Sequence, residues 1–133
     1  MVSDQRRLCL GGAGLHGLMA VSFGAFGAHG LKRLMTTLPP EEAALRLSWM
    51  ATGAHYQLAH AAALLALASL SIGATLKLHR AAWALLLGPL IFSGTLYAMA
   101  LGAPRWLGAV TPVGGLLMLA GWGLVLAEGW SRA

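Results

Sequence analysis

Charged residues are scarce in this chain, and acidic residues are the scarcest. Only 10% of the 133 residues are charged, whereas a soluble domain carries about 25%. The acidic residues are Asp4, Glu41, Glu42 and Glu128, and none of them lies inside a long apolar run. This excludes a Ser-His-Asp arrangement and a carboxylate-bearing metal site within those runs, and it favours a bilayer over water as the solvent.

Cysteine is almost absent and basic residues are dispersed. Cys9 is the only cysteine, which excludes an intrachain disulfide and a CxxC site. The formal net charge is +5, but the nine Lys and Arg residues are spread over the chain ends and connections. Without a basic helix or run, the sequence argues against nucleic-acid binding. Basic residues at loops are typical of membrane proteins.

Long apolar runs are abundant instead, since 58% of the residues are hydrophobic. A membrane-spanning helix needs about 20 apolar residues. Four runs satisfy this and predict spans at residues 8–30, 49–72, 81–101 and 106–127. Tryptophans at the span ends are typical of the membrane interface; they are Trp49, Trp83, Trp106 and Trp130. The prediction is a single all-α domain over residues 1–133, a four-transmembrane-helix bundle in the lipid bilayer.

Prolines mark two departures from simple spans. Pro40 followed by Glu41 and Glu42 is a helix-start signal, and no proline follows until the end of the second span. A helix that long would measure about 48 Å, too much for a core of about 30 Å. We therefore expect a juxtamembrane helix at residues 41–48. Pro89 within the third span predicts a kink.

Small residues predict where the helices pack. Ala20, Gly24 and Ala28 recur at every fourth position, a pattern that allows close helix approach in lipid. The further predicted packing positions are Gly27, Gly114 and Gly115. Such bare faces also favour self-association into a homo-oligomer or docking of partner membrane helices.

Polar side chains from all four spans are predicted to meet in one leaflet. The first and third spans end on the side where the second and fourth begin, and polar residues concentrate there. The predicted cluster, and candidate ligand-binding site, comprises His29, Tyr56, Gln57, His60, Ser93, Tyr97 and Thr111. At 100° per residue, His16 and His55 point off the cluster face, and we expect them to be helix-contact or interface residues.

Two interpretations of this cluster stay open. The polar groups satisfy one another and fix helix register, or they form a ligand or proton site. His29 and His60 would be candidate axial ligands of haem, although their depths differ by roughly 10–15 Å. A quinone fits the Tyr/His/Gln lining as an alternative. A transporter or proton-conducting module in an oligomer is a further alternative. We expect no metal, because a third ligand is lacking, no cofactor and no enzymatic activity.

Three sequence blocks together resemble a known family. They are Gly24-Ala25-Phe26-Gly27-Ala28-His29, then Thr52-Gly53 with Tyr56-Gln57 and His60, and then Phe92-Ser93-Gly94 with Leu96-Tyr97 and residues 111–115 and 121–122. In these blocks the chain is similar to bacterial inner-membrane proteins of domain of unknown function 423, which are similar to human transmembrane protein 256. The resemblance implies four membrane helices in a bacterial inner (plasma) membrane, and it implies no activity.

The basic residues give a slight preference for orientation. The side that holds the chain ends carries Arg6, Arg7, Lys77, Arg80 and Arg132, and the opposite side carries Lys32, Arg33, Arg46 and Arg105. By the positive-inside rule, this excess favours cytoplasmic termini.

Overall fold

The computed structural model describes residues 2–70 and 75–131, and all regular structure in these ranges is helical. The long helices are α1 (Val2–Phe26), α3 (Pro40–Ser69), α4 (Leu76–Ala100) and α5 (Thr111–Ser131). A π-helix (Gly27–Leu31) joins α1 to the short α2 (Lys32–Leu34), and a 3-10 helix (Arg105–Ala109) precedes α5. The all-α prediction is confirmed. The predicted end of the second span, at residue 72, and Arg132 lie outside the described residues.

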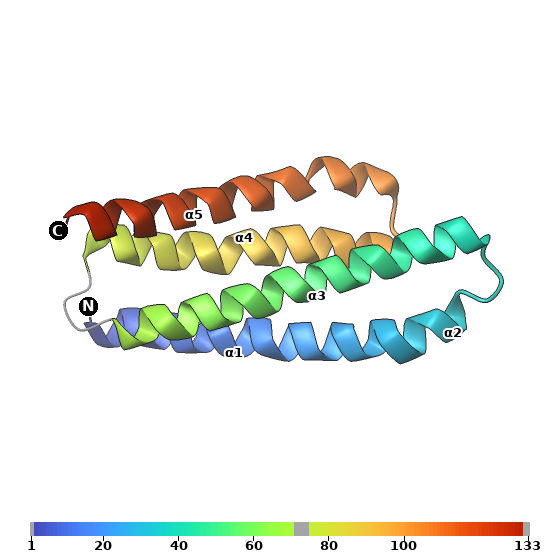
Figure 1. Ribbon diagram of the computed structural model, residues 1–133, viewed down its shortest axis with the longest axis horizontal. Coiled ribbons are helices and arrows are strands. Elements are labelled where there is room, and N and C mark those ends of the chain that lie inside the picture. The colour runs from blue at the N-terminus through green and yellow to red at the C-terminus, as the bar shows by residue number, and fades with distance from the viewer. Residues whose placement is uncertain (1, 71–74, 132–133) are drawn as a thin grey trace.

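The four long helices run side by side along the long axis of the molecule (Figure 1). The α2–α3 and α4–α5 connections lie at one end, and the two termini lie near the other (Figure 1). Helices α1, α3 and α4 pack on one another, while α5 packs on α4 and the 3-10 segment. In the described part of the chain, no extensive contact joins α5 to α1. The arrangement is therefore a three-helix core with α5 on its flank, rather than a closed four-helix bundle.

Three helical segments are long and apolar enough to cross a membrane. They are Asp4–Leu34, Leu76–Ala100 and Arg105–Ser131, which contain or nearly match the predicted first, third and fourth spans. Helix α3 does not reach the same apolarity, because its N-terminal and middle parts carry Glu41, Glu42, Arg46, Gln57 and His60. The structure therefore supports a helical membrane protein with several candidate spans.

The start of α3 agrees with the sequence signals. Pro40 occupies the first turn, with Glu41 and Glu42 in the same turn, where acidic side chains are favoured by the helix dipole. The helix continues unbroken to Ser69. The predicted juxtamembrane segment, residues 41–48, is thus the first part of one helix of roughly 45 Å.

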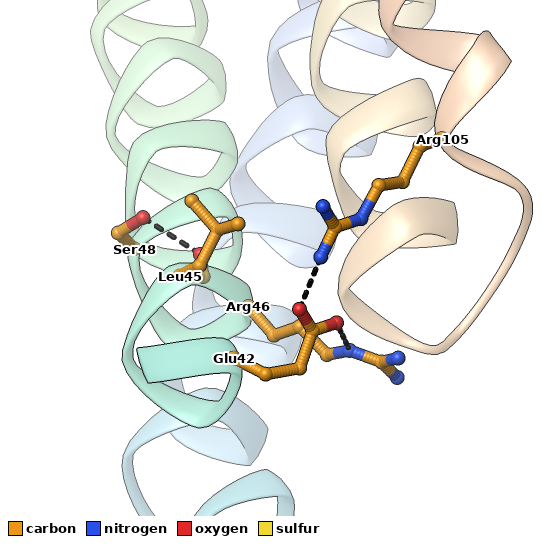
Figure 2. Close-up of polar contacts among 5 residues, drawn as sticks. All are labelled: Glu42, Leu45, Arg46, Ser48 and Arg105. Atoms are coloured by element: carbon orange, nitrogen blue, oxygen red, sulfur yellow. Dashed lines mark hydrogen bonds and ion pairs between the residues drawn. The ribbon is translucent and has the colours of Figure 1, made fainter. Parts of the chain in front are cut away.

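Glu42 ties the two connections at this end together (Figure 2). Its Oε1 accepts from Arg46 Nε at 2.7 Å, one turn later in α3, and its Oε2 accepts from Arg105 in the 3-10 segment. The hydrogen bond from Arg46, aided by the charge of Arg105, lowers the pKa of the Glu42 carboxyl. Gly102 turns the chain after α4 with φ 103°, a conformation that glycine adopts without strain.

Helices α4 and α5 approach each other through glycine. A Cβ at Gly114 would lie 2.5 Å from the backbone nitrogen of Phe92 and 2.6 Å from the carbonyl oxygen of Gly88. A Cβ at Gly121, two turns later, would lie 2.7 Å from Leu85 Cδ2. Both glycines therefore act as contact points, and Met118 is buried between them.

Glu128 lies inside the fold rather than in a polar tail. The sequence predicted that the fourth span ends at residue 127, but α5 continues to Ser131. The Glu128 side chain is buried, and its Oε2 accepts a 2.9 Å hydrogen bond from Thr75 Oγ1. Thr75 is the N-cap of α4 and accepts from the Leu78 amide. The carboxylate thus secures the start of α4 to the end of α5.

Candidate functional site

The predicted polar cluster separates into two sites and two outlying residues. Gln57, Ser93 and Tyr97 lie in the buried interior between α1, α3 and α4. Tyr56 and His60 line a pocket on the flank between α3 and α5. The remaining residues, His29 and Thr111, belong to neither.

The interior site is a chain of hydrogen bonds that links the three core helices. Tyr97 Oη on α4 donates to Gln57 Oε1 on α3 at 2.8 Å. Gln57 Nε2 contacts His16 Nδ1 on α1 at 3.3 Å, and His16 Nε2 contacts the carbonyl oxygen of Leu86 at 3.0 Å. Gln57 Nε2 also lies 3.5 Å from Met19 Sδ. We call these four residues, His16, Met19, Gln57 and Tyr97, the interior network.

The direction of every bond in the network follows from the Leu86 carbonyl. A carbonyl only accepts, so His16 Nε2 carries the proton and His16 Nδ1 accepts. Gln57 must then present its amide NH₂ to His16 and its oxygen to Tyr97, which donates. The chain of hydrogen bonds ends on the Leu86 carbonyl oxygen, which carries no proton to donate. The network thus satisfies its own groups, as expected for side chains that fix helix register.

Pro89 lies in the same turn of α4 as that carbonyl. Pro89 has no N–H for the Leu85 carbonyl, and its ring crowds the preceding turn. The next carbonyl, that of Leu86, accepts from His16. Helix α4 continues through Pro89 without interruption.

The ring of Tyr97 is held between two other helices. It stacks on Phe23 of α1 with ring centroids 4.1 Å apart. A Cβ at Gly53 of α3 would lie only 2.7 Å from Tyr97 Cε1. Ser93 Oγ donates to the Gly53 carbonyl at 2.8 Å. Gly53 therefore allows α3 and α4 to approach closely, and it leaves a carbonyl for Ser93.

The sequence interpretation placed His16 off the cluster face, which is wrong, although its expected role as a helix-contact residue is confirmed. Its side chain is fully buried and bonded at both ring nitrogens. His16 shares a face with three buried residues, since Cys9 and Ala13 lie seven and three residues before it and Ala20 lies four residues after it. That spacing is the signal that would have identified it.

His29 was predicted to lie in the polar cluster, and this is wrong, because its side chain is exposed. His16 and His29 are 13 residues apart, which places them about 140° apart around a helix. Only one of the two can face the core. Ala28 is exposed for a related reason, since the buried face continues from Ala20 of α1 to Gly27 of the π-helix. Gly27 meets α3, because a Cβ there would lie 2.7 Å from Met50 Cγ.

Of the predicted packing positions, Gly24 lies beside another helix and Gly115 does not. A Cβ at Gly24 would make an ordinary 3.7 Å contact with Ala54 of α3. A Cβ at Gly115 would meet nothing within 4 Å, so Gly115 is not a packing residue. Thr111 stands at the start of α5, where its hydroxyl lies 2.8 Å from that of Thr95.

The second site is a cavity of about 290 Å³ on the flank of the molecule, which we call the flank pocket. Two of its wall residues, Tyr56 and Trp122, are 40% and 48% exposed, so the pocket opens to the surroundings. Its walls are mostly aromatic and aliphatic, and they are Tyr56, His60, Phe92, Gly115, Met118, Leu119 and Trp122.

His60 is the main polar group of the flank pocket. Its Nδ1 lies 2.7 Å from the Tyr56 carbonyl oxygen, and its Nε2 accepts a 3.3 Å hydrogen bond from Trp122 Nε1. This bond is a side-chain bridge from α3 to α5. The Phe92 ring packs against Tyr56 with centroids 4.7 Å apart.

Neither site brings together the predicted pair of haem ligands. His29 is exposed and does not line the flank pocket, whereas His60 does. His16, the other buried histidine, has both ring nitrogens engaged in the interior network. Within residues 2–70 and 75–131, no group of three or more His, Cys, Asp or Glu side chains could hold a metal ion.

Comparison with known proteins places the chain in a family. The family model DUF423, described as a protein of unknown function, matches residues 23–115 of this chain. The chain belongs to the DUF423 family. A UPF0382 membrane protein of Haemophilus influenzae is 41% identical over 110 residues, which is 81% of this chain and 82% of the relative. The UPF0382 inner membrane protein YgdD of Escherichia coli is 39% identical over 115 residues, covering 86% and 82%. No solved structure matches significantly.

The DUF423 match includes part of each site. Residues 23–115 contain Gln57, His60, Ser93 and Tyr97. His16 and Trp122, which complete the interior network and the flank pocket, lie outside it. The family description gives no activity, so the function must be argued from the geometry.

Proposed function

We propose that this protein is a multi-pass inner-membrane protein whose four long helices all cross the bilayer, with α3 as the second crossing. The Glu42–Arg105 ion pair supports this topology, because it brings the α2–α3 and α4–α5 connections to one end of the molecule. With only three crossings, these connections would lie on opposite sides of a hydrocarbon core of about 30 Å. The relatives named as inner membrane proteins support the location.

Cysteine labelling distinguishes the two topologies. In a Cys9→Ala background, cysteines at Thr37 and Ser131, both exposed, should react with a membrane-impermeant maleimide from opposite sides. Intact spheroplasts and inverted vesicles give the two readings. Labelling of both positions from the same side would indicate three crossings. The charge balance of the loops favours cytoplasmic termini, so Ser131→Cys should react in inverted vesicles.

We propose further that the flank pocket binds a small lipid-soluble molecule and that the protein is not an enzyme. The observation that carries this is the pocket itself, an aromatic cavity of about 290 Å³ with one imidazole and one indole N–H. A mostly apolar, preformed pocket with few polar groups is typical of ligand sites. With four crossings, its opening between α3 and α5 faces lipid.

Filling the pocket should remove its ligand. Gly115 lines the pocket, and a Cβ there has open space, so Gly115→Leu projects into the cavity without displacing the backbone. We expect a lipophilic molecule that copurifies with the wild-type protein to fall at least tenfold in mass spectra, relative to bulk phospholipid.

The matched control is Gly123→Leu, on the same helix. Gly123 is exposed, has nothing within 4 Å of its Cβ position and does not line the pocket. Gly123→Leu should retain the molecule. Identical extracts from the wild-type protein and both variants would contradict ligand binding at this pocket.

A further inference from the structure

A second cavity, which we call the connection pocket, lies between α2, the start of α3 and the end of α4. Its volume is about 230 Å³. The apolar walls come from the segment before α3 and from the end of α4, chiefly Leu31, Leu34, Met35 and Leu101. Arg46 and Thr37 are the lining residues with polar side chains. The cavity therefore combines apolar walls with one cation.

The guanidinium of Arg46 has hydrogen-bonding capacity left over. Its Nε donates to Glu42 Oε1 at 2.7 Å. Within residues 2–70 and 75–131 this is the only hydrogen bond that the side chain donates, so the N–H groups on Nη1 and Nη2 have no protein acceptor. These two terminal nitrogens point away from the Glu42 carboxylate (Figure 2). A Cβ at Gly102 would lie 3.2 Å from Arg46 Nη1, which places Nη1 beside the α4 wall of the pocket.

Glu42 does not neutralise this end of the molecule. Its single carboxylate is shared by Arg46 and Arg105, so one positive charge of the two remains unbalanced. The two basic residues of α2 add to this charge, and Glu41 is the other acidic residue at the start of α3. The connection pocket therefore lies in a region that attracts anions.

The position of the connection pocket indicates what carries the anion. With four crossings, the connections at this end lie at the membrane surface, where anionic lipid headgroups attract basic residues next to the spans. The planar N–H groups of an arginine match the oxygens of a phosphate. Leu31, Leu34 and Leu101 offer apolar surface to the first carbons of an acyl chain.

We propose that the connection pocket binds an anionic phospholipid, whose phosphate oxygens accept from Nη1 and Nη2 of Arg46. This site is distinct from the flank pocket, because the two cavities share no lining residue. The inference uses the proposed four crossings to place the connection pocket at the membrane surface.

Two lipids with the same acyl chains test the charge of the headgroup. Dioleoylphosphatidylglycerol is anionic and dioleoylphosphatidylcholine is zwitterionic. Native mass spectrometry of the full chain in a neutral detergent measures the affinity of each lipid. We expect the anionic lipid to bind about tenfold more tightly, as is typical when a hydrogen bond to a charged group is gained. Excess inorganic phosphate should not displace it, because phosphate alone makes no contact with the apolar walls.

One pair of variants assigns the preference to Arg46. Arg46→Gln removes the terminal donors, and the affinity for the anionic lipid should fall about tenfold, towards that of the zwitterionic lipid. Arg33→Gln is the matched control. It removes the same charge from an exposed side chain of α2 that does not line the pocket, and it should retain most of the preference.

A second pair of variants leaves Arg46 in place. Thr36 and Thr37 are adjacent and both exposed, but only Thr37 lines the connection pocket. Thr37→Trp should obstruct the pocket and weaken binding of the anionic lipid severalfold, whereas Thr36→Trp should not. This pair keeps the inference testable if Arg46→Gln does not fold.

Three results would overturn the inference. They are equal affinities of the wild-type protein for the two lipids, equal losses in Arg46→Gln and Arg33→Gln, and displacement of the lipid by inorganic phosphate, which would indicate a site for a free anion. None of them would change the number of crossings or the flank pocket, which the cysteine labelling and Gly115→Leu test separately.

Discussion

Replacing Gly114 with alanine is expected to weaken the packing of α5 on α4. The added Cβ would lie 2.5 Å from the Phe92 nitrogen and 2.6 Å from the Gly88 oxygen, and both are backbone atoms that cannot rotate away. Overpacking of this kind costs roughly 1–3 kcal/mol or more. It outweighs the gain of about 0.5–1 kcal/mol that alanine brings to a helix interior. The measurement is the free energy of unfolding in detergent micelles.

The neighbouring glycine provides the control for this substitution. Gly115→Ala adds the same methyl group one residue later, where nothing lies within 4 Å. This variant should be as stable as the wild-type protein, or more stable by up to about 1 kcal/mol. If Gly114→Ala proved equally stable, the close approach of α4 and α5 at this point would be wrong.

Replacing Gln57 with leucine is expected to break the interior network from its centre. The Tyr97 hydroxyl would lose its acceptor and His16 Nδ1 would lose its donor, and all three side chains are buried. Leaving a buried group unpaired costs about 1–3 kcal/mol, whereas hydrogen bonds between membrane helices average only about 0.6 kcal/mol. Because two groups are orphaned together, we expect a loss of roughly 2–4 kcal/mol in the free energy of unfolding.

A double-mutant cycle with Tyr97→Phe separates the network from simple packing. Tyr97→Phe keeps the stacked ring against Phe23 and removes only the donor to Gln57. The double variant should lose less stability than the sum of the two single losses, with a coupling of about 1 kcal/mol. Additive losses would show that the 2.8 Å hydrogen bond contributes nothing.

His29→Ala, at an exposed position, should change the free energy of unfolding by less than about 0.5 kcal/mol.

The sequence predicted the helical elements well, because their signals are local. Uncharged apolar runs and the Pro40 start required no knowledge of neighbouring helices. The core positions Gln57, Ser93 and Tyr97 were also placed together, since they follow helical spacing on helices whose polar residues define one face.

The inward face of the first helix could not be predicted in the same way. Its residues are almost uniformly apolar or small, so no polar side marks the outside. The candidate site residue His29 suggested one face, whereas Cys9, Ala13 and His16 lie on another. Only contact with Gln57 and the Leu86 carbonyl decides between them. The flank pocket was likewise out of reach, because it depends on where α5 lies beside α3.

The glycine contacts of α5 have a consequence for how a guest enters the flank pocket. The pocket residues of α5 lie at or between Gly115 and Trp122, and the contacts at Gly114 and Gly121 lie at the two ends of this segment. The α5 wall of the pocket is thus packed tightly on α4 at both ends of the cavity. The opposite wall, α3, is held to α4 by the hydrogen bonds of Gln57 with Tyr97 and of Ser93 with the Gly53 carbonyl. Both walls are therefore preformed before a ligand binds, so little conformational entropy is lost on binding.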